Sequence, residues 1–338
     1  MTDGGEIIPG LVSVVICAWN NWPDLDMTIE SALLQSYQHL EVIVVDNSST
    51  DATSAEVPGR FSQRVRYIRQ PNKDTAGAYN AGFDVARGEF VQFVDGDDVL
   101  APNKIEKQIE VFMADQTVDV VYGDARMFQT LAGAASWTDP YIHQESDIWR
   151  ALISSHVGIC ALGTLWRRSA ILRVGPWDEN LYVEDLDYFL RAAWVGCRFA
   201  YCPGGPMGFS RVRPGQKSSS PAIAHGLELV WEKALGYVTR EPYRSLISAE
   251  LARHRFNMAL SSELTKKEAL VTLALARSTS PETISAIVYI TTCAAIFMPA
   301  IRTTWLRPVR RRLLAKFGFW ARLKSRSKDT GVTERAKS

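Results

Sequence analysis

The fold is decided by the stretch Phe90-Val91-Gln92-Phe93-Val94-Asp95-Gly96-Asp97-Asp98-Val99-Leu100. Its first half is apolar and rich in β-branched and aromatic residues, which predicts a buried strand that ends at three carboxylates around one glycine. Two carboxylates about 4 Å apart repel each other by about 4 kcal/mol at an effective dielectric constant near 20, so the cluster needs a cation or a raised pKa. Oxygen-only ligands favour Mg²⁺ or Mn²⁺, and Mg²⁺ is usually shared between one or two carboxylates and substrate phosphates. The alternative is that Asp97 or Asp98 only caps a helix that begins near Asn103.

The segments around this stretch alternate between buried strands and amphipathic helices. Strands are predicted over residues 11–18, 41–45, 65–69, 90–94 and 118–122, and helices over 22–35, 52–61, 75–86 and 103–114. This alternation predicts an α/β fold with a mostly parallel sheet and flanking helices. Ligands of such sheets bind at the carboxyl ends of the strands, so we expect the loops at Trp19, Asp46 and Asp95 to converge on one crevice.

Composition narrows the class of protein. The chain has 338 residues, 46% of them hydrophobic, and a formal net charge of +1, which indicates neither disorder nor nucleic-acid binding. Its five cysteines are scattered and form no CxxC pair, which argues against a disulfide framework or a zinc site. Residues 1–9 lack the basic and apolar regions of a signal peptide. We therefore expect a cytoplasmic protein.

A second informative stretch runs from Val174 to Arg191. Glu184 and Asp185 open a predicted helix there, and its apolar face contains Phe189. Acids at a helix N-terminus are stabilised by about 0.3 to 1 kcal/mol, so a purely structural role is the alternative for both. Between the two informative stretches, residues 131–145 show no sustained period and are expected to form a surface excursion.

Taken together, five segments of the chain resemble the inverting family 2 glycosyltransferases, which have a Rossmann-like GT-A fold. In order, the segments are residues 12–16 with Trp19-Asn20, 44–51, 80–82 with 86–90, 95–98, and 177–179 through Glu184-Asp185 to 190–191. Each is weak alone, but five in the family's order make a specific signal over roughly residues 11 to 215. The resemblance implies a GT-A catalytic domain over 1–217 that binds a nucleotide sugar, followed by a helical region over 218–338.

The resemblance also implies a role for each matching residue. Asp95 and Asp97 match the pair that holds Mn²⁺ or Mg²⁺ against the donor diphosphate. Asp185 matches the catalytic base, with Glu184 and Asp187 as supporting candidates, and a general base typically contributes about 10²- to 10⁴-fold in rate. The residues implied to bind the donor are Ala18, Trp19, Asn20, Asp46, Asn47, Asn80, Asp95, Gly96, Arg211 and Arg213.

Several positions depart from the family's usual residues. Asn47 stands where a second aspartate often accepts a hydrogen bond from the nucleobase of the donor. The identity of that nucleobase therefore stays open. Asp74 and Tyr79 stand where glycine and arginine are common, which removes one phosphate-facing cation. Arg213 replaces a frequent histidine; it cannot bind a metal ion but can pair with a diphosphate, and the alternative is an ordinary surface arginine.

The last third of the chain has a helical period over residues 222–237, 243–260 and 266–276. An uncharged segment, 284–301, follows and is slightly shorter than the ~20 residues that cross a bilayer. The tail, 302–328, interleaves ten cations with four aromatic residues, a pattern suited to an anionic membrane surface. We expect peripheral contact with the inner face of the cell membrane through 284–328, the alternative being a solvated basic tail whose aromatic residues pack on the catalytic domain.

The sequence as a whole predicts a metal-dependent inverting glycosyltransferase of polysaccharide biosynthesis. It would move a sugar from a nucleoside diphosphate donor to a hydroxyl of a cell-surface glycan or lipid-linked acceptor. A sugar nucleotidyltransferase is disfavoured, because residues 17–21 lack its glycine-rich basic phosphate loop. The alternative function is that of a catalytically decayed nucleotide-sugar-binding or scaffold protein, and no nucleic-acid partner is expected.

Overall fold

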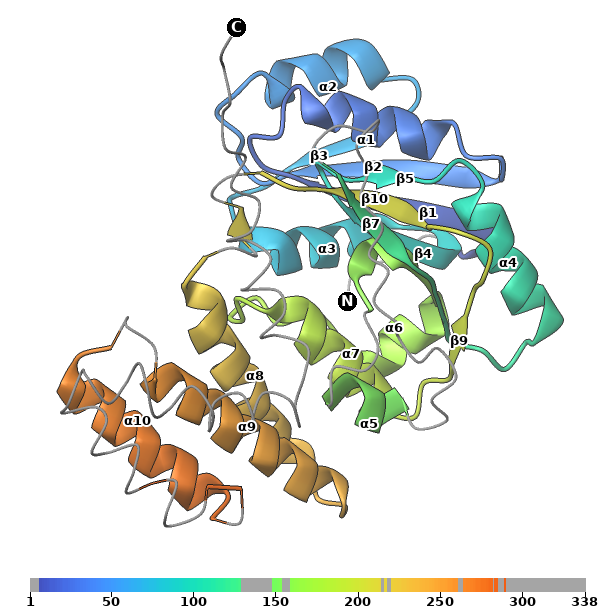
Figure 1. The fold of residues 1–338 in the computed structure, drawn as a ribbon. Coiled ribbons are helices and arrows are strands. Elements are labelled where there is room, and N and C mark those ends of the chain that lie inside the picture. Colours follow the sequence, from blue (N-terminus) through green and yellow to red (C-terminus); the bar gives the residue numbers. More distant parts are fainter. Residues whose placement is uncertain are drawn as a thin grey trace, which may run out of the picture. The chain divides into compact units, whose positions relative to one another are not determined.

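The computed structural model describes residues 6–128, 148–153, 159–213, 216–217, 220–260, 264–281, 283–284 and 289 (Figure 1). The chain divides into two compact units, one within residues 1–152 and 156–239 and the other within 153–155 and 240–338. The surface excursion expected over 131–145 and the tail 302–328 lie outside the described residues, as does the segment 284–301 apart from Ile284 and Tyr289.

The first unit is built on a seven-stranded sheet with the strand order β3-β2-β1-β4-β8-β6-β9. All neighbouring strands are parallel except β8, which is antiparallel to both β4 and β6. The mostly parallel sheet predicted from the sequence is confirmed, and β8 is a strand that was not predicted. The strands are β1 (Ile8–Ala18), β2 (Leu40–Asp46), β3 (Arg66–Arg69), β4 (Gly88–Asp95), β6 (Val120–Tyr122), β8 (Thr164–Arg167) and β9 (Phe199–Tyr201).

Helices cover both faces of this sheet (Figure 1). On one face, α1 (Asp24–Leu33), α2 (Thr53–Phe61) and α4 (Lys104–Ala114) bury their apolar sides in one core with residues of β1, β2, β4 and β6. On the other lie α3 (Asp74–Val85), α6 (Arg168–Val174) and α7 (Glu184–Trp194). A Cβ atom at Gly82 of α3 would lie 2.2 Å from Cγ1 of Val15. Glycine therefore lets α3 pack directly on β1.

A small second sheet lies beside the first, with the order β5-β10-β7. Its strands are β5 (Val99–Leu100), β7 (Ala125–Phe128) and β10 (Gly208–Arg211). β10 is antiparallel to β5 and parallel to β7. Because β5 directly follows the acidic turn 95–98, this pairing brings the basic segment after β10 to that turn.

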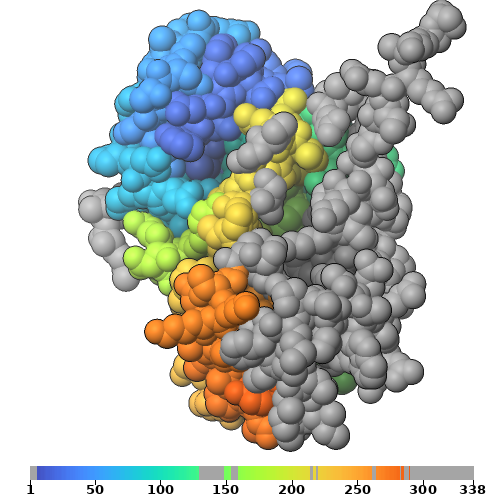
Figure 2. Space-filling view, turned by 60° about the vertical axis from the view of Figure 1, so that its left-hand side comes forward, coloured from blue at the N-terminus to red at the C-terminus, as the bar shows by residue number. Residues whose placement is uncertain are grey.

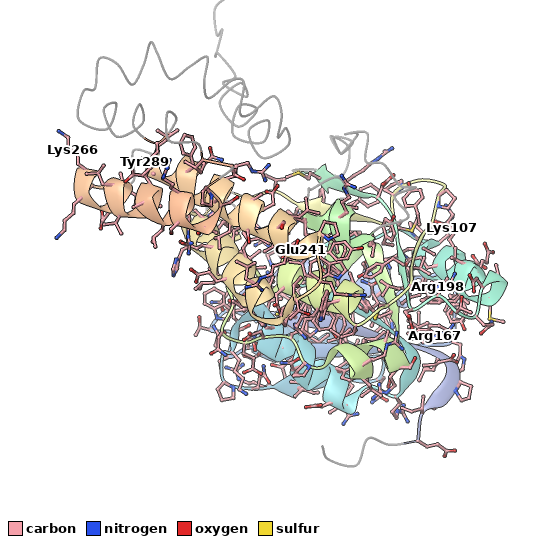
Figure 3. The ribbon with its side chains drawn as sticks, turned by 90° about the horizontal axis from the view of Figure 1, so that it is seen from below. Lys107, Arg167, Arg198, Glu241, Lys266 and Tyr289 are labelled. Atoms are coloured by element: carbon pink, nitrogen blue, oxygen red, sulfur yellow. The ribbon has the colours of Figure 1, made fainter. Side chains whose placement is uncertain are left out.

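An ion pair joins the inserted strand β8 to the parallel part of the main sheet. Nη1 of Arg167 lies 2.9 Å from Oε1 of Glu89 in β4, and Figure 3 labels Arg167 among the side chains of this region. The first unit also contains α5 (Ile148–Ile153), which ends at the boundary between the units, and α8 (Ala222–Tyr237). By packing, α8 therefore belongs with the first unit, whereas the division expected from composition came after residue 217. The assignment of 1–217 as the catalytic domain stays a prediction.

The second unit contains α9 (Tyr243–Ala259) and α10 (Lys266–Thr279), which pack through a core that includes Phe256 and Leu273. Together with α8, they lie at the predicted positions of the three helices. α10 begins with a capping box, in which the side chain of Thr265 and that of Glu268 each accept from the other's backbone N–H. In the described part of the chain, every helix is too short or too polar to cross a bilayer.

Candidate functional site

Three loops meet at the carboxyl edge of the main sheet because the strands before them are in register. Ala18 at the end of β1 pairs with Asp46 of β2, and Cys17 pairs with Asp95 of β4. The backbone N–H of Asn47 donates to the carbonyl of Ala18 at 2.9 Å, which continues the pairing past the strand ends. The chain thus leaves the three strands at one level, and the loops lie together at one edge of the sheet.

Gly96 lets the acidic turn pack against the end of β1. A Cβ atom there would lie 2.7 Å from the carbonyl oxygen of Cys17 and 2.9 Å from Oδ1 of Asn21. The turn is not a helix cap: α4 begins after Asn103, whose side chain makes no cap bond, and the backbone N–H of Ile105 in its first turn donates to Oε1 of Gln35 at 3.1 Å. The carboxylates of the turn therefore have another role than the capping considered from the sequence.

The side chain of Asp95 is held in position by a hydrogen bond from Tyr79. The hydroxyl of Tyr79 donates to Oδ1 of Asp95 at 2.9 Å, and its buried ring packs near Phe93 and Trp177 with ring centroids 4.9 and 5.1 Å away. The Asp95 side chain reaches solvent, yet protein atoms crowd it. This crowding and the charge of Asp97 raise the pKa of Asp95 to about 6, against the opposing effect of Tyr79. Tyr79 thus orients a carboxylate at the position where relatives often carry an arginine.

The other two carboxylates of the turn contact Arg211, the last residue of β10, and Arg213, which follows it. Nη2 of Arg213 lies 2.5 Å from Oδ2 of Asp97, and its Nη1 lies 3.7 Å from Oδ2 of Asp24 in α1. The backbone N–H of Arg211 donates to Oδ1 of the buried Asp98 at 3.0 Å. Burial and the neighbouring acidic charges raise the pKa of Asp98. In Figure 2, the yellow residues near 210 lie directly against the blue N-terminal part of the same unit.

Across the crevice, α7 begins with Glu184 and Asp185. Nζ of Lys217 lies 2.9 Å from Oε2 of Glu184 and 3.1 Å from Oδ2 of Asp74. Burial raises the pKa of Glu184 to about 7, although Lys217 acts in the opposite direction. Burial also raises the pKa of Asp185, whose Oδ1 accepts from the backbone N–H of Leu186 at 2.7 Å. Lys217 and Asp74 were not predicted to be site residues; the basic residues between 211 and 217 were the available signal for Lys217.

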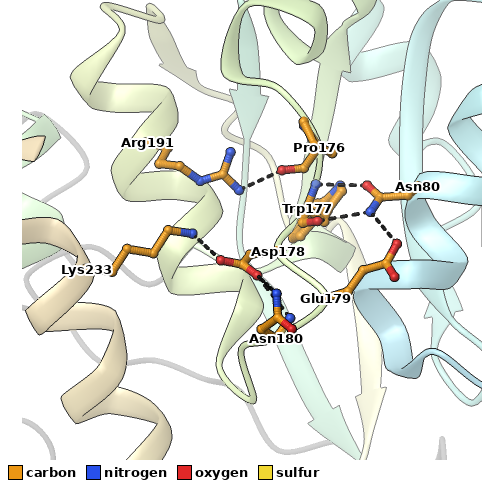
Figure 4. A pocket seen from close by; sticks show the side chains of 8 residues that line it. All are labelled: Asn80, Pro176, Trp177, Asp178, Glu179, Asn180, Arg191 and Lys233. Atoms are coloured by element: carbon orange, nitrogen blue, oxygen red, sulfur yellow. Dashed lines mark hydrogen bonds and ion pairs between the residues drawn. The ribbon is translucent and has the colours of Figure 1, made fainter. Parts of the chain in front are cut away.

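A loop before α7 lines an open pocket of about 540 Å³, shown in Figure 4. Oδ1 of Asn80 accepts from the backbone N–H of Trp177 at 2.8 Å, and its Nδ2 donates to the Trp177 carbonyl at 3.0 Å and to Oε1 of Glu179 at 3.2 Å. The Asn80 amide thus holds this loop, and its contact with the donor stays a prediction. The pocket is lined by Asn80, Pro176, Trp177, Asp178, Glu179, Asn180, Arg191 and Lys233.

The same pocket contains the ion pairs that hold α7 in place. Asp187 is buried and accepts from Nε of Arg191 at 2.8 Å, while Nζ of Lys233 lies 2.9 Å from its other oxygen. Trp177 stacks on Tyr188 with ring centroids 3.8 Å apart. These contacts fix the helix that presents Asp185 to the crevice.

Asp46, the last residue of β2, and Asn47, which follows it, both accept hydrogen bonds from other side chains of the protein. Oδ2 of the fully buried Asp46 accepts from the Tyr67 hydroxyl at 2.5 Å and from Nη1 of Arg69 at 2.7 Å. Oδ1 of the buried Asn47 accepts from Nε2 of Gln70 at 2.8 Å. If Asp46 and Asn47 also contact the nucleobase of the sugar donor, as predicted, they would use the oxygen lone pairs that these hydrogen bonds leave free.

The loop after β1 presents the most accessible aromatic surface of the predicted donor site. Trp19 is 54% exposed. Asn20 adopts a left-handed backbone conformation, with φ of 53°, and its Oδ1 accepts from the backbone N–H of Thr50 at 2.7 Å. Asn20 thus ties the first loop to the second, and Trp19 is left to face the solvent.

The family description that matches the chain is Glycosyl transferase family 2, over residues 13–173. The succinoglycan biosynthesis protein ExoO of Rhizobium meliloti (strain 1021) is 36% identical over 198 residues, which cover 55% of this chain and 56% of ExoO. The UDP-Glc:alpha-D-GlcNAc-diphosphoundecaprenol beta-1,3-glucosyltransferase WfaP of Escherichia coli is 36% identical over 115 residues, which cover 34% of this chain and 45% of WfaP. The chain thus spans about half the length of these two curated relatives.

Solved structures share the fold over nearly the whole chain. The S. aureus TarS 1-349 complex with UDP-GlcNAc superposes with a TM-score of 0.63 at 18% identity, covering 96% of this chain and 93% of that chain. The mannosyltransferase PcManGT from Pyrobaculum calidifontis, in complex with GDP-Man and Mn²⁺, gives a TM-score of 0.55 at 18% identity and covers 96% of this chain and 88% of that one. Together with the sheet order, they establish the GT-A fold that the sequence predicts.

Proposed function

Because the chain belongs to glycosyl transferase family 2 through residues 13–173, we propose that it transfers a sugar from a nucleoside diphosphate donor to a hydroxyl group with inversion. One observation carries the proposal: Asp95, at the carboxyl end of β4, lies close enough to Asp185 for their charges to interact, and Arg213 and Lys217 pair with Asp97 and Glu184. The nucleotide-sugar complexes of TarS and PcManGT support this class of donor.

We infer that Asp95 and Asp97 hold Mn²⁺ or Mg²⁺. Among the described residues, each of these two aspartates keeps one carboxylate oxygen without a hydrogen bond or ion pair. The described residues contain no group of three or more His, Cys, Asp or Glu arranged for a metal ion. Two carboxylates suffice for Mg²⁺, which takes its other ligands from water and substrate phosphates. When bound, the ion would neutralise the charge of the departing diphosphate, and the Mn²⁺ in PcManGT supports this inference.

We infer that Asp185 is the general base. Its Oδ1 accepts from the backbone N–H of Leu186, and this contact orients the carboxylate at the first turn of α7. The second oxygen is then available for the proton of the acceptor hydroxyl. As the hydroxyl oxygen bonds to the anomeric carbon, that proton moves to Asp185 and the nucleoside diphosphate leaves from the opposite side of the sugar.

We infer a glycan or lipid-linked acceptor at the cytoplasmic face of the membrane. WfaP is named for an acceptor linked to diphosphoundecaprenol, and ExoO for succinoglycan biosynthesis. The basic tail, residues 302–328, would bring the catalytic unit to such an acceptor. Flotation with phosphatidylglycerol vesicles tests this step: the full chain should float, and replacement of Arg310, Arg311 and Arg312 by glutamine should reduce flotation. Equal flotation of both proteins would contradict membrane contact through the tail.

The release of nucleoside diphosphate from a panel of UDP-, GDP- and dTDP-sugars tests the transferase function. We expect one donor to be turned over with Mn²⁺ or Mg²⁺, and EDTA or Asp97→Asn to abolish the release. Asp185→Asn should lower turnover by about 10²- to 10⁴-fold while the affinity for the nucleotide is kept. Asp115→Asn, at an exposed ion pair with Arg198, is the control.

Two outcomes of this assay would contradict the proposal. Full turnover by Asp185→Asn would reject that residue as the base. Tight donor binding without turnover, even with glycan and lipid-diphosphate acceptors supplied, would favour the alternative of a catalytically decayed nucleotide-sugar-binding protein.

A further inference from the structure

Of the cations at the end of β10 and just after it, two are paired with carboxylates that the proposed function needs. We refer to Arg211, Arg213 and Lys217 as the basic strap. Arg213 pairs with Asp97 at 2.5 Å, and Lys217 pairs with Glu184 at 2.9 Å. In this arrangement Asp97 is a proposed metal ligand whose Oδ2 is already taken by a guanidinium group.

The start of the strap is fixed to the acidic turn through its backbone. The N–H of Arg211 donates to Oδ1 of Asp98 at 3.0 Å, and Nε of Arg211 donates to the Asp97 carbonyl at 3.3 Å. The backbone N–H of Arg213 donates to Oε1 of Gln216 at 2.8 Å. The side chain of Arg213 is 33% exposed, so it can turn away from Asp97 without displacing the backbone contacts of Arg211.

A divalent cation and the guanidinium of Arg213 compete for the same carboxylate. Both are positive and both bind the Asp97 carboxylate, so each disfavours the other. A diphosphate offers Arg213 a different partner, because guanidinium groups bind phosphate oxygens in a bidentate manner. A nucleotide whose diphosphate takes Arg213 therefore leaves Asp97 available to the metal ion.

We propose that Arg213 is a latch on Asp97, which keeps the divalent-cation site closed until a nucleoside diphosphate draws the arginine away. The inference rests on the proposed function, since it takes Asp95 and Asp97 as the metal ligands and a nucleoside diphosphate as part of the donor. Because binding linkage is reciprocal, the metal ion tightens nucleotide binding by the same factor as the nucleotide tightens metal binding.

Calorimetric titration of the full chain with Mn²⁺ in the absence of nucleotide tests the latch. We expect wild-type protein to bind Mn²⁺ weakly, and UDP or GDP to tighten this binding by at least about 10-fold. Arg213→Gln should bind Mn²⁺ alone about 10-fold more tightly than wild type, because Oδ2 of Asp97 is released. The factor by which nucleotide tightens Mn²⁺ binding should fall correspondingly in this variant, leaving the part that comes from direct metal–phosphate contacts.

Arg211→Gln is the matched control. It removes the same charge from the same strap, but the Arg211 guanidinium pairs with Asp24, at 3.3 Å, and not with the Asp97 carboxylate. Its affinity for Mn²⁺ alone should therefore stay within about 3-fold of wild type. An Arg213→Gln protein that binds Mn²⁺ no more tightly than Arg211→Gln overturns the latch.

A separate result distinguishes failure of the latch from failure of the proposed function. Asp97→Asn should abolish Mn²⁺ binding to the nucleotide complex. If it does so while Arg213→Gln behaves like Arg211→Gln, the metal site stands and the latch is wrong. If wild type binds neither Mn²⁺ nor any nucleotide, or if Asp97→Asn changes nothing, the proposed metal site is wrong and the latch with it.

Discussion

Replacing Glu184 with glutamine tests how the ionisation of Glu184, at the start of α7, changes the free energy of unfolding. The Glu184 side chain is 11% exposed, and Nζ of Lys217 lies 2.9 Å from its Oε2. Burial raises the pKa of Glu184 from 4.5 to about 7, and Lys217 opposes this effect. Glutamine keeps the shape of the side chain and an oxygen for Lys217, but it does not titrate. The comparison of the two proteins therefore reports on the ionisation of this one group.

The sign and size of the effect follow from proton linkage. The unfolded chain loses the Glu184 proton near pH 4.5, whereas the folded chain keeps it up to about pH 7. Between these values the folded state binds more protons than the unfolded state, so the free energy of unfolding falls as pH rises. A pKa difference of about 2.5, at about 1.36 kcal/mol for each unit, corresponds to about 3 kcal/mol. This stabilisation is fully present below pH 4.5 and is lost as pH rises through 7.

Urea unfolding at pH 5, 6, 7 and 8, followed by tryptophan fluorescence in the presence of EDTA, measures this contribution. Relative to wild type, Glu184→Gln should gain about 2 to 3 kcal/mol in the free energy of unfolding between pH 5 and pH 8. Glu30→Gln, which removes a carboxylate from an exposed ion pair with Arg64, is the control and should change by less than about 0.5 kcal/mol. A Glu184→Gln difference that stays constant within about 0.5 kcal/mol over this range would refute the reasoning.

Three further substitutions test individual contacts of the crevice. Tyr79→Phe removes the hydroxyl that donates to Asp95 and should weaken Mn²⁺ binding about 10-fold in calorimetry; unchanged affinity would show that Tyr79 does not orient this carboxylate. Gly96→Ala places a Cβ 2.7 Å from the Cys17 carbonyl and should lower the free energy of unfolding by about 1 to 3 kcal/mol, and an unchanged urea midpoint would contradict this close contact. Trp19→Ala should leave stability within about 0.5 kcal/mol, since the side chain is 54% exposed, and weaken UDP or GDP binding by about 5- to 100-fold; equal nucleotide affinity would remove Trp19 from the donor site.

The main elements of the fold are predictable because each carries its signal locally. The segments that become β1, β2 and β4 are continuous apolar runs, which is typical of strands buried on both faces. The helices that cover them show the clear helical period of an amphipathic segment. The order of strands and helices then leads to a mostly parallel sheet, and that sheet places the predicted loops at one edge. The strands β5, β8 and β10 have only two to four residues, so no such period was available for them.

The role of Asn80 also depends on contacts that the sequence does not indicate. Its position on α3 is predictable, but its amide bonds with Trp177, which is 97 residues away in the chain. These bonds support the loop before α7, and the donor contact that the resemblance implies for Asn80 stays a prediction. A local sequence pattern indicates the residue type and its secondary structure, but it does not indicate which distant residue that side chain contacts.

By itself, the sequence determined the alternation of strands and helices, the three carboxylates after β4 and the acidic start of α7, because local periodicity and residue type decide these features. Only the tertiary structure decided which charges are paired. β10 joins β5 from a position more than a hundred residues later, and this pairing sets Arg211 and Arg213 against the acidic turn. Electrostatic interactions depend on distance in space, so the ion pair that links Arg213 to Asp97 appears only when the small sheet is formed.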